Sequence, residues 1–402
     1  MLNEIKNIAI ITPGTLPVPC SKGGAVETLI EFYLQENEIN RTYHFHVISI
    51  YDEVSKKLAN NYKNSSFYFY MQDNMFNKIK RFIYGKTCSS FYYNKYMDYY
   101  GKWAFKLINH LKPDAVIIEN RQGFIFHAPV KHKYPIILHL HNDTLYNGIK
   151  FANKIADKFD LIITVSKYLK KRIESINTKS NIEVIYNGIE LDKFTKTNYS
   201  FYNKKDFGLK DNDFVVIYSG RITEIKGIRE LLKSFLYLKK YPQIKLLIVG
   251  SSNYGDQSKD DFTQEMYSLS KTIGEQIIFT GYIPYYKMPS IMKLADISII
   301  PSICEDALTL VSIESMASGI PLIITHSGGI PEAVDSNCGI ILDKCNLSIL
   351  PSLIADAILL LYNDKDKRKK MSENCIKKAS FFNKDIYTQK IFLSFNKILN
   401  TL

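Results

Sequence analysis

Hydrophobic residues along the chain follow two alternating patterns. Short apolar runs rich in Ile, Val and Leu alternate with longer segments in which apolar residues recur every three or four positions. The runs are almost continuously apolar, which is typical of parallel strands that are covered on both faces. They lie at residues 7–12, 44–50, 115–119, 136–140 and 161–165, and again at 214–218, 244–249, 277–279, 297–300 and 322–325. The pattern therefore predicts an α/β fold built from two doubly wound domains.

A stretch without periodicity separates the two groups of strands. Between Asn187 and about Gly208, polar residues, Asn and Gly replace the apolar pattern. We place the hinge near Thr195, which gives an N-terminal domain over 1–195 and a second domain over 196–380. A final amphipathic segment, 381–402, is predicted to form a helix.

Composition narrows the class of protein. Of 402 residues, 46% are hydrophobic and 23% are charged, which is ordinary globular usage. No apolar run approaches the ~20 residues that cross a bilayer, and the N-terminus lacks the apolar region of a signal peptide. Six scattered cysteines without a CxxC pair predict free thiols. We therefore expect a cytoplasmic protein.

A formal net charge of +12 favours an anionic partner. A phosphate-bearing substrate, a membrane surface and a nucleic acid all fit the charge equally well. Local motifs have to decide among them.

A basic turn links the strand at 214–218 to a segment whose apolar stripe predicts a helix over 227–240. Arg221 and Lys226 bracket this turn. A guanidinium binds phosphate oxygens through two N–H donors, a lysine adds a point charge, and a helix N-terminus adds oriented amides. The turn therefore suits a diphosphate. On this segment alone, two solvated loop charges remain the alternative.

Acidic residues gather in a later loop and in the helical segment that follows it. Glu305 and Asp306 lie in the loop, and Glu314 lies on the predicted helix. An ionised carboxylate accepts two hydroxyl hydrogen bonds side by side, which suits a ribose diol. The alternative for Glu314 is an ordinary glutamate on a helix surface.

In combination, these motifs resemble the donor site of the retaining glycosyltransferases of family 4, which have the GT-B fold. The frame Gly-Arg-x-x-x-x-Lys-Gly at 220–227 is followed by Asp306-x7-Glu314-x-Met-Ala-x-Gly319. Further segments resemble the family's glycine loop (21–25), active-site histidine strand (138–143), interdomain segment (185–189) and glycine turn beside the donor (327–332). The resemblance covers nearly the whole chain. It implies two Rossmann-like domains facing across a cleft, with the last helix returning to the N-terminal domain.

The resemblance also implies a role for each matched position. Arg221 and Lys226 would hold the donor's diphosphate and offset the charge that develops as it leaves, so that neither a metal ion nor another cofactor is required. Glu314 would bind the ribose. The other expected contacts are Asp306 with Ala307, Leu308 and Thr309 at the transferred sugar, Gly281, Tyr282 and Ile283 at the nucleobase, Gly23 and Gly24 near the diphosphate and acceptor, and His141 facing the sugar.

The acid that contacts the sugar departs from the family pattern, which usually has Glu where this chain has Asp306. Glu305 immediately precedes it. Either acid fits the role, and the spacing favours Asp306.

Two histidines on the strand at 136–140 and just after it, His139 and His141, share a face and suggest a metal pair. Only Asn142 and Asp143 lie near them in the sequence, so we favour no metal there. His141 lies nearer the strand's carboxyl end, where α/β sheets bind ligands. His139 is expected to pack in a supporting position.

Residues 71–110 interleave basic and aromatic side chains. This pattern suits an anionic membrane surface, where a lipid-linked acceptor would be reached. Aromatic core residues beside solvated lysines are the alternative. RNA binding fits less well because no RNA-recognition motif is present, and we expect no nucleic-acid partner.

The sequence thus predicts a retaining transferase that moves a hexose or N-acetylhexosamine from a nucleoside diphosphate sugar, with UDP favoured, to a glycan or lipid-linked acceptor in surface polysaccharide assembly. A peripheral position at the inner face of the cell membrane is compatible with this function. Two alternatives are a nucleotide-sugar epimerase of the same architecture and a catalytically silent binding homologue. The donor sugar, the acceptor and the linkage stay open.

Overall fold

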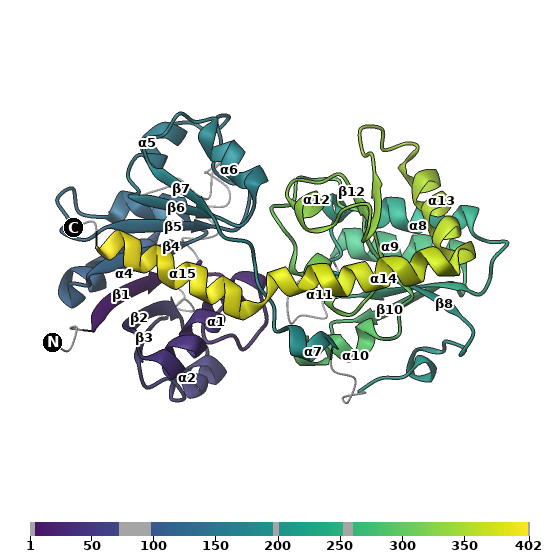
Figure 1. Ribbon diagram of the computed structural model, residues 1–402, viewed down its shortest axis with the longest axis horizontal. Helices are drawn as coiled ribbons and strands as arrows, with labels where there is room; N and C mark the ends of the chain where they lie inside the picture. Colours follow the sequence, from purple (N-terminus) through teal and green to yellow (C-terminus); the bar gives the residue numbers. More distant parts are fainter. Residues whose placement is uncertain (1–4, 72–97, 196–200, 252–259, 401–402) are drawn as a thin grey trace. The chain divides into compact units, whose positions relative to one another are not determined.

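The chain divides into two compact units. The computed structural model describes residues 5–71, 98–195, 201–251 and 260–400. One unit runs up to Tyr186 and includes the chain from Tyr387 onward, and the second runs from Asn187 to Ile386 (Figure 1). The sequence interpretation placed the boundary at 195/196, whereas the structural division falls before Asn187.

Local contacts explain this earlier boundary. The side-chain amide of Asn187 donates a hydrogen bond to the Leu308 carbonyl at 3.0 Å. The short helix α7 (Leu191–Thr195) packs against α11 (Leu310–Ala317). The segment before Thr195 therefore belongs to the second unit.

The first unit contains a seven-stranded parallel sheet in the order β3-β2-β1-β4-β5-β6-β7. Its strands are β1 (Lys6–Ile11), β2 (Tyr43–Ile50), β3 (Ser65–Tyr70), β4 (Ala115–Glu119), β5 (Ile136–Leu140), β6 (Leu161–Thr164) and β7 (Asn181–Val184). The central strands β1, β4 and β5 are almost entirely buried. Burial on both faces explains their continuous apolar sequences.

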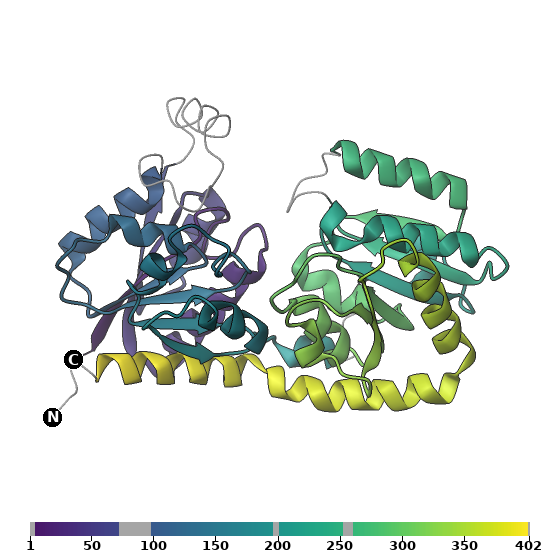
Figure 2. The same cartoon turned by 90° about the horizontal axis from the view of Figure 1, so that it is seen from above.

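Helices cover both faces of this sheet. Figure 2 shows α15 (Lys384–Leu399) along one face and α4 (Tyr99–Leu111) on the opposite one. The other helical elements of the unit are α1 (Ala25–Asn40), α2 (Glu53–Ala59), η1 (Gln122–His127), α5 (Ala152–Ala156) and α6 (Lys167–Glu174). On the α15 face, Phe395 packs edge-on against Tyr33 of α1, with ring centroids 6.3 Å apart. The end of the chain thus completes the core of the first unit.

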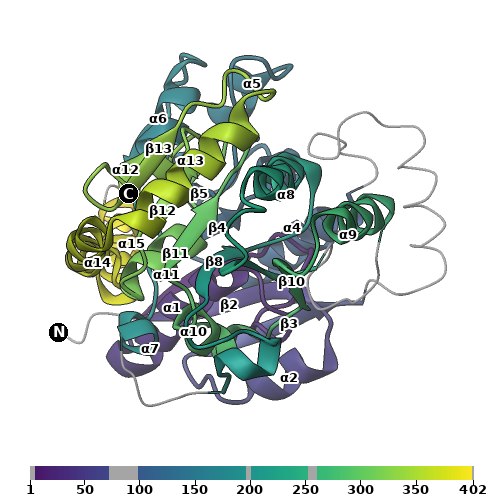
Figure 3. The ribbon, with the colours of Figure 1, turned by 90° about the vertical axis from the view of Figure 1, so that its right-hand side faces the viewer.

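The second unit contains a six-stranded parallel sheet in the order β10-β9-β8-β11-β12-β13. Its strands are β8 (Phe214–Ser219), β9 (Ile244–Val249), β10 (Ile277–Gly281), β11 (Ile297–Ile300), β12 (Leu322–Thr325) and β13 (Gly339–Leu342). Figure 3 shows α8 (Ile228–Tyr237), α9 (Asp261–Ile273) and α13 (Leu350–Asn363) on one face, and α14 (Lys365–Ala379) on the other. The remaining helical elements are η2 (Lys204–Phe207), η3 (Glu224–Lys226), η4 (Tyr285–Lys287), α10 (Met288–Met292), α12 (Ile330–Ala333) and η5 (Ser380–Phe382).

The prediction of two doubly wound sheets is confirmed, and each predicted strand coincides with an observed one to within a residue or two. The sequence analysis missed β3, β7 and β13. All three are edge strands of their sheets, and their residues are largely half-buried or exposed. None of the helices in the described ranges combines the length and apolar composition that a bilayer-spanning segment requires.

Candidate functional site

Two loops of the second unit meet at the carboxyl ends of neighbouring strands. One follows β8 and the other follows β11, and these strands are paired in parallel. The carbonyl of Ile225 in the first loop accepts hydrogen bonds from the amides of Ile303 and Cys304 in the second, at 3.0 and 3.2 Å. The two loops are therefore joined at the sheet edge where α/β proteins bind ligands.

Gly227 allows the closest approach between these loops. Its φ of +69° lies in the left-handed region, and a Cβ at this position would stand 1.9 Å from the carbonyl oxygen of Pro301. A larger residue would force the loops apart. The glycine therefore brings its neighbour Lys226 next to the second loop.

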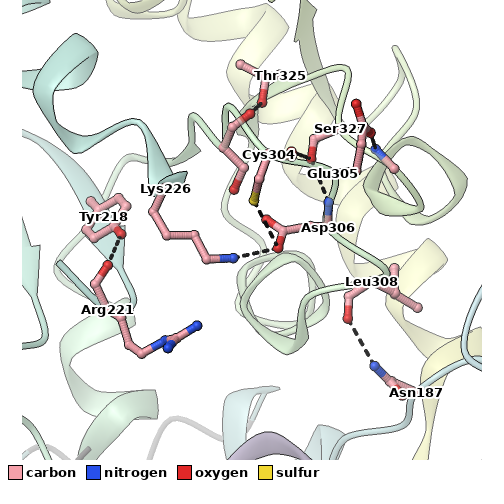
Figure 4. A network of polar contacts seen from close by, with 12 residues as sticks. Asn187, Tyr218, Arg221, Lys226, Cys304, Glu305, Asp306, Leu308, Thr325 and Ser327 are labelled. Atoms are coloured by element: carbon pink, nitrogen blue, oxygen red, sulfur yellow. Dashed lines mark hydrogen bonds and ion pairs between the residues drawn. The ribbon is translucent and has the colours of Figure 1, made fainter. Parts of the chain in front are cut away.

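Lys226 and Asp306 meet directly. The Lys226 Nζ lies 2.5 Å from Asp306 Oδ1, and the two side chains are only 19% and 13% exposed (Figure 4). Partial burial strengthens such a pair relative to one on the open surface. The second oxygen, Asp306 Oδ2, is buried and has no hydrogen-bond partner among the described residues. An acceptor atom is thus held beside the ammonium group.

A glycine turn holds the backbone of Asp306 in place. The Asp306 amide donates to Ser327 Oγ at 3.0 Å, and the Gly329 amide donates to the Asp306 carbonyl at 2.7 Å. Gly328, between them, has a φ of +48°, and a Cβ there would lie 2.0 Å from the Asp306 carbonyl oxygen. The turn at 327–332 therefore has a definite structural role, which is to position Asp306.

Glu305 has different partners. Its carboxylate forms an ion pair with Lys344 at 2.8 Å and accepts a hydrogen bond from the Gly328 amide at 2.5 Å. Lys344 also donates to the Cys304 carbonyl at 3.0 Å. Glu305 therefore braces the loop, and the geometry favours Asp306 as the acid beside Lys226. Its contact with a sugar stays a prediction.

Arg221 precedes Lys226 on the same loop, in an exposed position. Its carbonyl accepts a hydrogen bond from the Tyr218 hydroxyl at 2.7 Å, which fixes the backbone at this point. Figure 4 shows its guanidinium extending from the loop on the side where Lys226 reaches Asp306. The two basic side chains thus come from one short, well-anchored turn.

Glu314 lies in the second turn of α11 and is 4% exposed. Burial raises the pKa of its carboxyl to about 7, against the opposing effect of the neighbouring Tyr285. Tyr285 begins η4, four residues after the end of β10. The acid predicted to hold the ribose therefore lies near the segment that follows the loop predicted to meet the nucleobase.

The other predicted donor residues lie around these groups. Gly281, Tyr282 and Ile283 are half-buried, and the Gly281 carbonyl accepts a hydrogen bond from Gly250 at 3.0 Å. Ala307 and Leu308 are buried, and the Leu308 carbonyl is already occupied by Asn187. One of the two acceptor positions of this carbonyl oxygen is therefore already used.

Thr309 caps α11 without a side-chain hydrogen bond, and its Oγ1 is buried without a partner among the described residues. Gly23 and Gly24 belong to the first unit. They precede α1 with φ values of +80° and +113°.

His141 also lies in the first unit, at the carboxyl end of β5, and has a partner that the sequence analysis missed. Its Nε2 is 2.8 Å from Glu119 Oε2, and His139 Nδ1 is 3.1 Å from the same oxygen. The expectation that only Asn142 and Asp143 accompany the histidines is therefore wrong. Glu119 ends β4, which is next to β5 in the sheet. In the sequence, an acidic residue at the end of an apolar run could have indicated this partner.

These three residues satisfy a simple criterion for a metal site, with ligand atoms within 4.8 Å of one another. Burial and the neighbouring His139 lower the pKa of His141 to about 4, against the opposing effect of Glu119. His141 is therefore neutral near pH 7.

Most of the predicted membrane segment, residues 72–97, lies outside the described residues. Tyr100 of α4 is buried in the core, and its hydroxyl donates to the Ile48 carbonyl at 2.6 Å. Tyr100 is therefore a core residue, as in the alternative interpretation of this segment.

Comparison with known proteins gives two family matches along the chain. Residues 44–193 match the model described as Glycosyltransferase Family 4, and residues 201–378 match Glycosyl transferases group 1. Together they cover most of both units.

Relatives and solved structures agree with these matches. A putative glycosyltransferase, YtcC, of Bacillus subtilis is 30% identical over 60% of this chain and 62% of its own length. The capsular polysaccharide biosynthesis glycosyltransferase CapM of Staphylococcus aureus is 27% identical over 73% of this chain and 77% of its own. Anabaena HepE, solved with UDP-glucose, superposes with a TM-score of 0.74 at 18% identity, over 98% of this chain and 100% of that one. The last match shows a shared fold.

Proposed function

Because this chain belongs to the GT-B glycosyltransferases of the family 4 type, we propose that it transfers a hexose or N-acetylhexosamine from a nucleoside diphosphate sugar to an acceptor hydroxyl, with retention at the anomeric carbon. The observation that carries the proposal is the half-buried pair of Lys226 and Asp306, beside Arg221. A fixed cation next to an acceptor of hydroxyl hydrogen bonds suits the junction between a diphosphate and a sugar.

The basic side chains act on the leaving group. As the bond between the anomeric carbon and the diphosphate oxygen breaks, negative charge develops on the diphosphate. Lys226 and Arg221 stabilise this charge in place of a divalent cation. The acceptor oxygen bonds to the anomeric carbon on the same face of the sugar, and its proton passes to a departing diphosphate oxygen. Asp306 holds a hydroxyl of the transferred sugar.

A uridine nucleotide is the favoured donor. HepE, which shares the fold, is described with UDP and with UDP-glucose. We assign the two ribose hydroxyls to Glu314 and the base to the loop at 281–283, which precedes Tyr285, a neighbour of Glu314, in the sequence. These contacts to the ribose and the base are part of the proposal.

The favoured acceptor is a glycan or a lipid-linked glycan of a surface polysaccharide. The CapM relative is named for capsular polysaccharide biosynthesis, which supports this setting. A peripheral position at a membrane would bring the enzyme to a lipid-linked acceptor.

A panel of nucleoside diphosphate sugars tests the proposal through two readouts, thermal stabilisation of the protein and release of nucleoside diphosphate. Lys226→Ala and Arg221→Ala should each lower turnover about 10²-fold or more and leave the fold intact. The matched control is Lys378→Ala, because Lys378 forms an ion pair with Asp335 at 2.6 Å elsewhere in the same unit. Turnover near that of the control in both site variants would refute the diphosphate assignment.

A further inference from the structure

A closed polar cluster lies inside the first unit, below the carboxyl end of β5. At its centre is Glu119, which is fully buried. Tyr33 of α1 donates its hydroxyl to Glu119 Oε1 at 2.9 Å. The other oxygen, Oε2, faces His139 and His141. Both carboxylate oxygens are thus engaged, as a buried charge requires.

The final helix closes this cluster. Tyr387 of α15 is buried, and its ring lies nearly parallel to that of His139, with centroids 6.3 Å apart. A further acid, Glu27 of α1, is also buried nearby. The cluster therefore draws its members from two strands and two helices, and this environment leaves Glu119 little freedom to move.

The distances within the cluster fit hydrogen bonds better than a shared metal ion. Ligands that bind one tetrahedral zinc at about 2.0–2.1 Å stand about 3.3 Å apart. The separation of His141 Nε2 and Glu119 Oε2 is 2.8 Å, which is a charge-assisted hydrogen bond. The Asn120 side chain also accepts a hydrogen bond from the His141 amide at 3.1 Å. The loop after β4 therefore holds both the ring and the backbone of His141.

We propose that Glu119 is a positioning residue for His141: its carboxylate accepts the Nε2 proton, fixes the imidazole ring, and leaves Nδ1 as the basic nitrogen of the side chain. This inference rests on the proposed function and on the role that the family resemblance implies for His141, which is to face the transferred sugar. Nδ1 is buried and has no partner among the described residues. It is the ring atom left to accept a hydrogen bond from a ligand.

The charge state of the cluster agrees with this arrangement. Burial alone would raise the pKa of Glu119, but the two imidazoles outweigh it and bring the pKa down to about 2. Glu119 is therefore ionised, and His141 is neutral, across the range in which a transferase is assayed. The remaining groups that face the cluster are His139, Tyr33, Tyr387 and Glu27.

Nitrogen NMR on the full chain with labelled histidines tests the arrangement without any activity. The signals of His141 are assigned by their loss in His141→Asn. We expect a neutral ring protonated at Nε2 that does not titrate between pH 6 and pH 8. A ring protonated at Nδ1, or one that titrates in this range, would overturn the proposal. One equivalent of tightly bound zinc in the purified protein would overturn it as well.

A double-mutant cycle tests the consequence for catalysis. Glu119→Gln preserves the shape of the side chain, and we expect it to lower turnover about 10²-fold with little change in the KM for the donor. Adding Glu119→Gln to His141→Asn should cause no further loss, because Glu119 acts through His141. If the two substitutions lower turnover independently, so that their effects multiply in the double variant, the role of Glu119 is merely structural.

The catalytic role of His141 and its positioning by Glu119 can be refuted separately. Full activity of His141→Asn with the expected tautomer in the wild type would refute the role of His141 in the proposed function and keep the geometry. Full activity of Glu119→Gln while His141→Asn is inactive would refute positioning by Glu119. His46→Asn is the control, because His46 lies on β2 and contacts Tyr68 outside the cluster.

Discussion

The glycine turn that holds Asp306 offers a sharp test of the candidate site. In Gly328→Ala, the new Cβ would stand 2.0 Å from the Asp306 carbonyl oxygen, where ordinary contacts begin at 3.4 Å. The backbones must separate by more than 1 Å, which strains the hydrogen bond from Gly329. A displacement of about 1 Å at a reacting group can lower turnover about 10²-fold. We expect a loss of that size.

Strain in the backbone alone must be subtracted from this effect. An L-residue in the left-handed region costs about 1–2 kcal/mol. Gly208 has a φ of +68°, and a Cβ there would meet nothing within 4 Å. Gly208→Ala therefore carries the same conformational cost without displacing a neighbour, and serves as the matched control.

The measurements are urea unfolding and the initial rate of nucleoside diphosphate release with the active donor. Both variants should lose stability, and Gly328→Ala alone should lose turnover. If the two variants have the same turnover, the turn does not position a catalytic group, and the assignment of Asp306 fails.

Two further predictions concern pH and metal ions. The pKa of Glu314 is raised to about 7, so the carboxyl is protonated below that pH and ionised above it. If the ionised form accepts the ribose hydroxyls, the affinity for the donor should rise about tenfold from pH 6 to pH 8, as calorimetry can measure. The rise should vanish in Glu314→Gln, and its persistence there would assign the titration to another group. If Arg221 and Lys226 supply the positive charge, as proposed, turnover should survive dialysis against EDTA; a loss that Mg²⁺ or Mn²⁺ restores would contradict this.

The sequence predicted the central strands well because burial on both faces leaves a clear signal. The strands β3 and β7 lie at the edges of their sheet, and their sequences mix aromatic or aliphatic residues with polar ones. Their pairing depends on neighbours that are remote in the chain. A sequence pattern alone does not supply that information.

For the site, the residue types and spacing pointed to Lys226 and Asp306, and the structure brings them into contact. Glu119 was missed for a physical reason. The register of β4 and β5 pairs Glu119 with His139, and this register is set by the packing of the whole sheet. Likewise, the choice between Asp306 and Glu305 depended on Lys344, which is distant in sequence and engages Glu305.

The position of α15 has a consequence for the biosynthesis of the protein. Tyr43 of β2 packs against Phe392, with ring centroids 5.4 Å apart, and its hydroxyl donates to Asn396 at 2.7 Å. These partners leave the ribosome more than three hundred residues after Tyr43. The first unit is therefore translated first, but its core is completed only when synthesis ends. Until then its aromatic surface is exposed and can aggregate with other nascent chains.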